Sequence, residues 1–202
     1  MPTTFLLIRH GATSFLGNRL SGRTPGVHLS EEGLAQAADL VDRLKSISLD
    51  HIYSSPLERA LETAEPLAAS RSLKVDVNEE LAEIDFGEWA GKTFQELEPD
   101  PAWQRFNRFR SGSRAPQGES MLSVQYRITV ELERLRLQHP ETTIAIFSHS
   151  DAIKAALMFY LGIPMDFFLR FEINPASVSA LVLSEHGVHV LRMNDDGPLH
   201  LR

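Results

Sequence analysis

Two histidines stand directly behind apolar runs that are typical of buried strands. The run 4–8 is followed by Arg9 and His10, and the run 143–147 is followed by a serine and His149. Because ligand sites of α/β proteins form at the carboxyl ends of strands, we expect both histidines at one sheet edge. A histidine there can act as nucleophile, base or metal ligand. An adjacent arginine suits a phosphate or carboxylate, since its fork matches two oxygens at once.

A third strand-to-helix turn adds a second arginine. Residues 51–54 are predicted as a short strand, and Pro56 sits where a helix commonly starts, which puts Arg59 in the first helical turn. This strand would deliver Arg59 to the same edge as the histidines. The alternative is a surface arginine that pairs with Glu58 or Glu62.

An acid-rich segment completes the set of candidate groups. Glu83, Asp85 and Glu88 lie beside apolar residues that include Phe86 and Trp89. A carboxyl pressed against apolar surface has a raised pKa, which suits a general acid. The alternative is a solvated acidic loop whose aromatic side chains fill the core.

Two histidines, two arginines and one acid are the groups that phosphoryl transfer through a phosphohistidine needs. A neutral imidazole attacks phosphorus, and the arginines hold the oxygens over which the transition state spreads its charge. The acid protonates the leaving oxygen and then activates water. This chemistry requires neither a metal nor another cofactor, because the protein's own cations neutralise the phosphoryl group.

With these residues in place, the chain resembles the histidine phosphatase superfamily, in its phosphoglycerate mutase-like branch (branch 1). The resemblance runs from about residue 4 to about residue 183. Its marks, in the family's order, are the segments 7–13, 29–37, 54–64, 81–91, 118–120 and 148–149. Two positions depart from the usual pattern, since Ala12 and Ala90 stand where glutamate is common.

The resemblance implies a role for each candidate. His10 would be the phosphorylated nucleophile, and Glu83 would be the proton donor rather than the two carboxylates that follow it. The implied phosphate pocket consists of Arg9, Arg59 and His149. The implied substrate-binding residues are Gly11, Thr13, Asn18, Arg23 and Ser150. Residues 15–17 make the path from His10 to Asn18 longer than is usual in the family.

Strands and helices alternate along the chain, which predicts an α/β fold. We expect a three-layer α/β/α sandwich with a mostly parallel sheet and an antiparallel edge, as in phosphoglycerate mutase-like proteins. The predicted strands are 4–8, 51–54, 73–77, 143–147 and a C-terminal hairpin of 178–183 and 188–191. The predicted helices begin near Ser30, Pro56, Thr93, Pro101, Ser120 and Asp151. Pro66 should kink or end its helix.

The length fits one domain, residues 1–202, and the resemblance implies a lid-like insertion at about 85–120. The net charge of −7 and the absence of a Lys/Arg run argue against nucleic acid as a partner. The chain has no cysteine, which excludes disulfides and thiolate metal sites. No apolar stretch is long enough for a membrane span and the start lacks a basic region, so we expect a cytoplasmic protein.

The leading hypothesis is a metal-independent phosphatase that hydrolyses phosphate monoesters of small metabolites. One alternative is a phosphoglycerate mutase with the same nucleophile, although this compact chain lacks the longer lid insertions of such mutases. Another is a catalytically silent regulatory domain on the same fold. The C-terminal hairpin could supply the edge of a homodimer.

Other polar and aromatic residues receive no catalytic role. The remaining histidines show no paired ligand spacing, so we expect no metal site. Trp103, Phe106 and Phe109 recur at helical spacing and are read as core, with substrate contact as the alternative. Four arginines are expected on a solvated face, with guidance of an anionic substrate as the alternative: Arg105, Arg108, Arg110 and Arg114. The tail from Gly197 onward is expected to fray.

Overall fold

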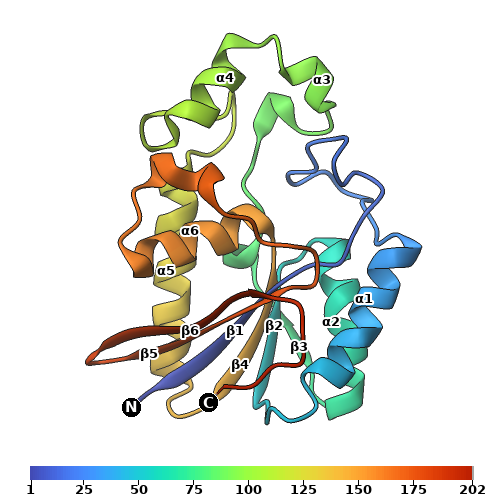
Figure 1. Ribbon diagram of the computed structural model, residues 1–202, viewed down its shortest axis with the longest axis vertical. Coiled ribbons are helices and arrows are strands. Elements are labelled where there is room, and N and C mark those ends of the chain that lie inside the picture. The colour runs from blue at the N-terminus through green and yellow to red at the C-terminus, as the bar shows by residue number, and fades with distance from the viewer. Residues whose placement is uncertain (202) are drawn as a thin grey trace.

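A computed structural model describes residues 1–201 and shows one six-stranded sheet between layers of helices (Figure 1). The strand order is β3-β2-β4-β1-β5-β6, in which β1 pairs parallel with β4 and antiparallel with β5. The strands are β1 (Thr3–Arg9), β2 (His51–Ser54), β3 (Val75–Val77), β4 (Thr143–Ser148), β5 (Val178–Ser184) and β6 (Gly187–Asp195). The expected α/β sandwich with a mostly parallel sheet and an antiparallel edge is confirmed.

Two core clusters lie on opposite faces of the sheet, because successive side chains of a strand point to opposite sides. Leu6 and Ile8 of β1 pack with the α1 and α2 side, whereas Phe5 and Leu7 pack with the α5 and α6 side. Burial on both faces explains why β1 is an unbroken apolar run. The helices are α1 (Glu31–Arg43), α2 (Glu58–Arg71), α3 (Phe94–Leu97), α4 (Pro101–Arg108), α5 (Met121–Gln138) and α6 (Ser150–Leu161).

The predicted starts of α1, α3 and α5 are present with their side-chain caps. The predicted start at Pro56 is wrong, because α2 begins at Glu58 after Leu57, which forms no side-chain cap. The Ser30 hydroxyl accepts from the backbone N–H of Gly33, and the Ser120 hydroxyl accepts from that of Ser123. Thr93 and Glu96 form a capping box at α3. Each contact satisfies a helix N–H that has no partner within its own helix, and this fixes where the loops before α1, α3 and α5 end.

The segment between Asp85 and Ser120 forms a separate layer over the carboxyl ends of the parallel strands. It contains α3, α4 and two short 3₁₀ helices, and in Figure 1 it lies at the opposite end of the molecule from the chain termini. Trp89 and Phe106 are buried in a third cluster that also includes Met158 of α6 and Phe168. Of the predicted aromatic stripe, Phe106 is core, Trp103 is partly buried and Phe109 is exposed.

Three further local predictions are corrected. Pro66 does not end helix α2, which continues to Arg71, because buried residues of its last turns such as Leu67 hold it against the sheet. Strand β3 begins at Val75 rather than at residue 73. The C-terminal tail does not fray up to residue 201: Leu199 is buried and its N–H donates to the Arg43 carbonyl. Residue 202 lies outside the described part.

None of the helices within residues 1–201 has both the length and the apolar character that crossing a membrane requires.

Candidate active site

The carboxyl ends of three neighbouring parallel strands bring the candidate residues together. Arg9 ends β1 and pairs in register with Ser148 of β4, and the N–H of His10 donates to the Ser148 carbonyl over 3.0 Å. His149 follows as the residue that precedes α6. The rings of His10 and His149 lie 5.1 Å apart between centroids. The strand-end rule therefore predicts the neighbourhood of both histidines.

The hydrogen bonds of His10 define its tautomer. Its Nδ1 lies 2.7 Å from the carbonyl oxygen of Gly11, which can only accept, so Nδ1 carries the hydrogen. Its Nε2 then carries no hydrogen, and its lone pair accepts from Nε of Arg59 over 3.3 Å. Burial, followed by the charges of Arg59 and Arg9, lowers the pKa of His10 well below its ordinary value. The ring is therefore neutral at physiological pH and offers Nε2 as a nucleophile.

Arg59 is fully buried in the first turn of α2, so the surface-arginine alternative is wrong. Its Nη2 donates to the Gly22 carbonyl over 2.7 Å, and its Nη1 has no hydrogen-bond partner among the described residues. The carboxylates that were its alternative partners are used elsewhere. Glu58 accepts from the N–H of Gly26, and Glu62 accepts from that of Leu29.

Three of the candidate residues have a buried side-chain nitrogen without a hydrogen-bond partner among the described residues. Besides Nη1 of Arg59, Nε of Arg9 and Nδ1 of His149 are buried with no hydrogen-bond partner within residues 1–201. Nε2 of His149 lies 2.7 Å from the hydroxyl of Ser55, and Nη1 of Arg9 donates to the Ile173 carbonyl. Because buried polar groups are almost always paired, these donors are suited to the oxygens of a phosphoryl group.

Glu83 is a buried carboxyl, so the solvated-loop alternative is wrong for this residue. Its Oε1 accepts from the N–H of Ile84 over 2.9 Å. Burial first, and the charge of Asp151 second, raise the pKa of Glu83 to about 7. The other two carboxylates of the segment differ: Asp85 caps a turn by accepting from the N–H of Gly87, and Glu88 is exposed. A pKa of about 7 leaves the Glu83 carboxyl protonated for about half of the time near neutral pH.

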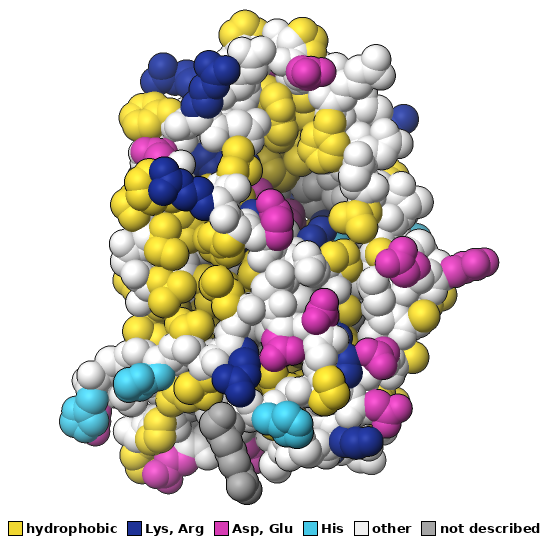
Figure 2. All heavy atoms as spheres, viewed as in Figure 1, with side chains coloured by type: hydrophobic (Ala, Val, Ile, Leu, Met, Phe, Trp, Pro, Cys, Tyr) yellow, Lys and Arg dark blue, Asp and Glu magenta, His cyan; other side chains and the backbone are white. Residues whose placement is uncertain are grey.

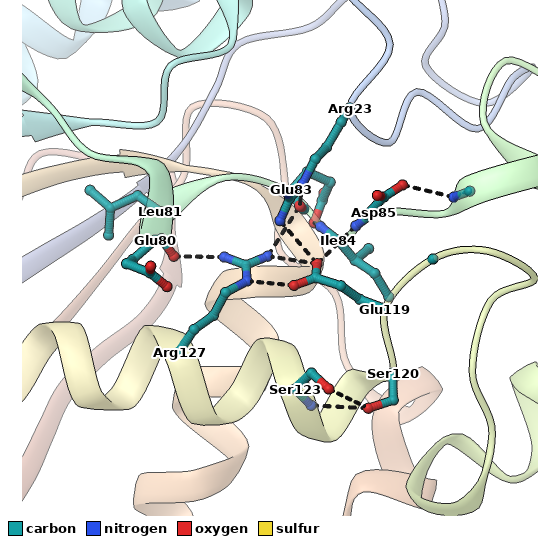
Figure 3. Close-up of polar contacts among 12 residues, drawn as sticks. Arg23, Glu80, Leu81, Glu83, Ile84, Asp85, Glu119, Ser120, Ser123 and Arg127 are labelled. Atoms are coloured by element: carbon teal, nitrogen blue, oxygen red, sulfur yellow. Dashed lines mark hydrogen bonds and ion pairs between the residues drawn. The ribbon is translucent and has the colours of Figure 1, made fainter.

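A carboxylate from the start of α5 fixes the backbone around Glu83 (Figure 3). Glu119 accepts from Nη2 of Arg23, from Nε and Nη2 of Arg127, and from the N–H of Asp85. The same two arginines donate to the Glu83 carbonyl, Arg23 over 2.8 Å and Arg127 over 3.1 Å. Burial alone would raise the pKa of Glu119, but these hydrogen bonds lower it. Arg23 thus holds the acid-bearing loop and does not line the cavity.

The cavity over His10 has a volume of about 320 Å³. It is lined by Arg9, His10, Thr13, Leu16, Gly17, Arg19, Leu20, Ser21, Gly22, Arg59, Glu83, Phe86, Phe94, Ser150, Asp151 and Glu172. Six of the predicted site residues are in this lining, whereas Gly11, Asn18, Arg23 and His149 are not. Asn18 is exposed, and its N–H donates to the Phe15 carbonyl, whereas the neighbouring Arg19 lines the cavity.

The close approach of two glycines positions the loop that follows β1. A Cβ atom on Gly11 would lie 2.6 Å from the Gly33 carbonyl oxygen, and one on Gly33 would lie 2.1 Å from the Ala12 carbonyl oxygen. The N–H of Gly11 also donates to the hydroxyl of Thr63. Only glycine fits at both positions, and the contact presses the backbone of the His10 loop onto the start of α1.

One expected surface residue is part of the site's surroundings. Arg110 is buried between the rings of Phe106 and Phe168, and its Nη1 lies 3.5 Å from Oδ2 of Asp151. An arginine is stable there because its guanidinium stacks on aromatic faces. The other three arginines of that set are exposed. Within residues 1–201, no group of three or more histidine, cysteine or acidic side chains could hold a metal ion.

Comparisons with known proteins agree with this geometry. A family model described as "Histidine phosphatase superfamily (branch 1)" matches residues 5–196. Phosphoserine phosphatase 1 of Hydrogenobacter thermophilus is 32% identical over 196 residues, which is 94% of this chain and 90% of the relative. Other curated relatives are longer, and the chain spans about half of their length (53%).

Solved structures share the fold over the whole chain. Bacillus stearothermophilus YhfR has a TM-score of 0.90 at 29% identity, covering 96% of this chain and 97% of that one. A phosphoserine phosphatase mutant from Entamoeba histolytica, in complex with phosphoserine, has a TM-score of 0.86 at 30% identity. That match covers 98% of this chain and 100% of the Entamoeba histolytica chain.

Proposed function

Since the chain belongs to the histidine phosphatase superfamily (branch 1), we propose that it hydrolyses phosphate monoesters of small metabolites through a phosphohistidine at His10. The observation that carries this proposal is the pairing of a neutral His10, whose Nε2 is free to attack, with a protonated Glu83 in the same cavity. Relatives named as phosphatases support hydrolysis as the outcome.

In the first step, Nε2 of His10 forms a bond to phosphorus while the bond from phosphorus to the ester oxygen breaks. Glu83 gives its proton to the departing alkoxide, so the alcohol leaves neutral. Arg9, Arg59 and His149 donate to the phosphoryl oxygens with the hydrogens that are otherwise unpaired. The Gly11 carbonyl stabilises the positive charge that the attacked ring acquires, through its contact with Nδ1.

In the second step, the Glu83 carboxylate takes a proton from water, and the hydroxide oxygen bonds to phosphorus. The bond from phosphorus to Nε2 of His10 then breaks, and inorganic phosphate leaves. The carboxyl is protonated again at the end of the cycle, so acid and base are one group. A pKa of about 7 suits both duties near neutral pH.

We assign the segment 85–120 to a lid, because α3 and α4 stand over the cavity and Phe86 and Phe94 form part of its lining. Thr13 and Ser150 line the same cavity and complete the substrate-binding set that we propose. The cations of the pocket take the role that a metal has in other phosphatases, and we expect activity to persist in a chelator. We place the reaction in the cytoplasm.

The decisive experiment is quenched-flow turnover of a ³²P-labelled aryl phosphate without added bisphosphoglycerate. We expect an acid-labile, alkali-stable protein adduct on His10, followed by release of inorganic phosphate, and neither from His10→Ala. Label on another residue would refute the nucleophile assignment. In a parallel reaction that also contains unlabelled 3-phosphoglycerate, label that passes only to phosphoglycerate would identify a mutase instead. Complete absence of turnover would indicate a silent regulatory domain.

A further inference from the structure

The cavity continues beyond the phosphate pocket into a second space of about 280 Å³. The two spaces share six lining residues, which are Leu20, Phe86, Phe94, Ser150, Asp151 and Glu172. The second space adds Arg110 and Lys154 and the aromatic side chains of Trp103 and Phe168. Figure 2 shows this face of the molecule hollowed below α3 and α4, with hydrophobic side chains on the upper wall and charged ones below. The second space is open to the alcohol part of a substrate whose phosphate lies beside His10.

The charged residues of this passage form two pairs. Nη1 of Arg110 lies 3.5 Å from Oδ2 of Asp151, and Nζ of Lys154 lies 3.3 Å from Oε2 of Glu172. The two cations are side chains that are 5% and 4% exposed, and both lie against the ring of Phe168, at 4.0 Å and 4.7 Å from its centroid.

The carboxylates of these pairs stand in front of the cations. Asp151 and Glu172 line the space next to His10 as well as the second space, whereas Arg110 and Lys154 line only the second. Asp151 is 18% exposed and Glu172 is 72% exposed, so both are more accessible than their partners. The buried cations hold the carboxylates in place through these contacts. Beyond the arginines around the phosphate, a group that extends from the ester oxygen toward the second space therefore meets these two carboxylates before it meets their cations.

We propose that Asp151 and Glu172 select the leaving alcohol by charge: they accept hydrogen bonds from its hydroxyl or ammonium groups and repel alcohols that carry a carboxylate beside the ester. This specificity rests on the phosphatase function proposed above. The substrate class is then the phosphate monoester of a polyol, a sugar or an amino alcohol. Phosphoglycerates are disfavoured, because their carboxylate would meet Asp151 and Glu172 in front of the cations Arg110 and Lys154.

Two matched probes test this specificity. Glycerol 3-phosphate and 3-phosphoglycerate differ in one group, a hydroxymethyl in the first and a carboxylate in the second. Their inhibition constants are measured against p-nitrophenyl phosphate hydrolysis at fixed pH and ionic strength, so the result holds whether or not they are turned over. We expect wild-type protein to bind glycerol 3-phosphate at least about tenfold more tightly, since one like charge at short range has such an effect even when it is partly screened.

Charge-removing variants assign the preference to these two residues. Glu172→Gln should narrow the ratio of the two inhibition constants about threefold or more, and Asp151→Asn should narrow it further. Glu185→Gln is the control, because it makes the same change in net charge at the exposed turn of the β5–β6 hairpin. Glu172 is the more exposed of the two carboxylates, so its variant keeps the test valid if Asp151→Asn does not fold.

Several outcomes would overturn the specificity while leaving the phosphatase function intact. The first is that wild-type protein binds 3-phosphoglycerate as tightly as glycerol 3-phosphate or more tightly. The second is that Glu172→Gln leaves the ratio of the two inhibition constants unchanged. The third is that Glu185→Gln changes this ratio as much as Glu172→Gln does. Failure of the phosphatase function itself has a different signature, which is aryl phosphate hydrolysis that survives His10→Ala.

Discussion

Replacing Glu83 by glutamine tests the acid that the structure places in the cavity. The variant keeps the side chain's size and its acceptor for the Ile84 N–H but has no proton to give. For an alkyl phosphate, whose alkoxide leaves poorly, loss of general acid catalysis should lower kcat/KM by about 10²–10⁴-fold. For p-nitrophenyl phosphate, whose phenolate leaves without help, the loss should be much smaller. The quantity kcat/KM reports the first step alone, so the later use of Glu83 as a base does not enter.

The pH dependence gives the same test a second readout. With a pKa of about 7, the protonated fraction of Glu83 is about 90% at pH 6 and about 10% at pH 8, so kcat/KM for the alkyl phosphate should fall about tenfold between these values. On the acid side the rate falls only when His10 becomes protonated, and its lowered pKa moves that limb well below the ordinary value. The profile is therefore bell-shaped, and the alkaline limb belongs to Glu83.

The assay compares wild-type protein, Glu83→Gln and Glu88→Gln over pH 5–9 with both substrates. The substrate's own phosphate titrates near pH 6, but it does so for every variant and cancels in their ratios. Glu88 is the matched control because it is an exposed glutamate of the same segment. An alkaline limb that persists unchanged in Glu83→Gln would refute the assignment. A loss that is equal for both substrates would make Glu83 a positioning residue.

Four further outcomes are expected. Glu83→Gln should raise Tm at pH 8 but not at pH 4. Between pH 4.5 and about 7 the folded wild-type protein binds more protons than the unfolded chain, so its free energy of unfolding falls by roughly 3 kcal/mol as pH rises. Glutamine does not titrate, so the variant escapes this loss. Glu119→Ala should cost about 2–4 kcal/mol in urea unfolding, since it strands Arg23 and Arg127, and Glu88→Ala should cost almost nothing. Gly33→Ala should cost about 1–3 kcal/mol, because its Cβ would meet the carbonyl oxygen of the facing loop, and unchanged stability would contradict that close approach. Activity measured with and without EDTA should be equal, and loss that added divalent ions restore would refute a metal-independent reaction.

The catalytic edge could be predicted because its signals are local. A strand-ending histidine, a helix-starting arginine and a carboxyl among apolar residues each depend on a few neighbouring positions, and parallel strands bring their carboxyl ends together. The same reasoning predicted the caps at Ser30, Thr93 and Ser120. Pro66 shows its limit, since tertiary packing of α2 outweighs the local effect of one proline.

The surroundings of the site could not be predicted, because they depend on contacts between distant segments. The sequence predicts a solvated face for Arg110, and its burial follows only from the packing of Phe168 against the lid segment. The segment 118–120 is a mark of the family, but nothing local indicates that Glu119 reaches Arg23 on the loop after β1. Such contacts join residues with no shared periodicity, so one sequence does not reveal them.

The two chain ends lie at the end of the molecule opposite the lid, at the bottom of Figure 1. A support or a fluorescent reporter attached there would not obstruct the mouth of the cleft. The amino end is the better attachment point, because Met1 is exposed. Leu199 near the other end is buried and donates to the carbonyl of Arg43, the last residue of α1, so a pulling force there would strain that helix. In single molecules tethered by the amino end, the opening of the active-site cavity would face the solution, which allows individual turnovers to be observed in a flow cell.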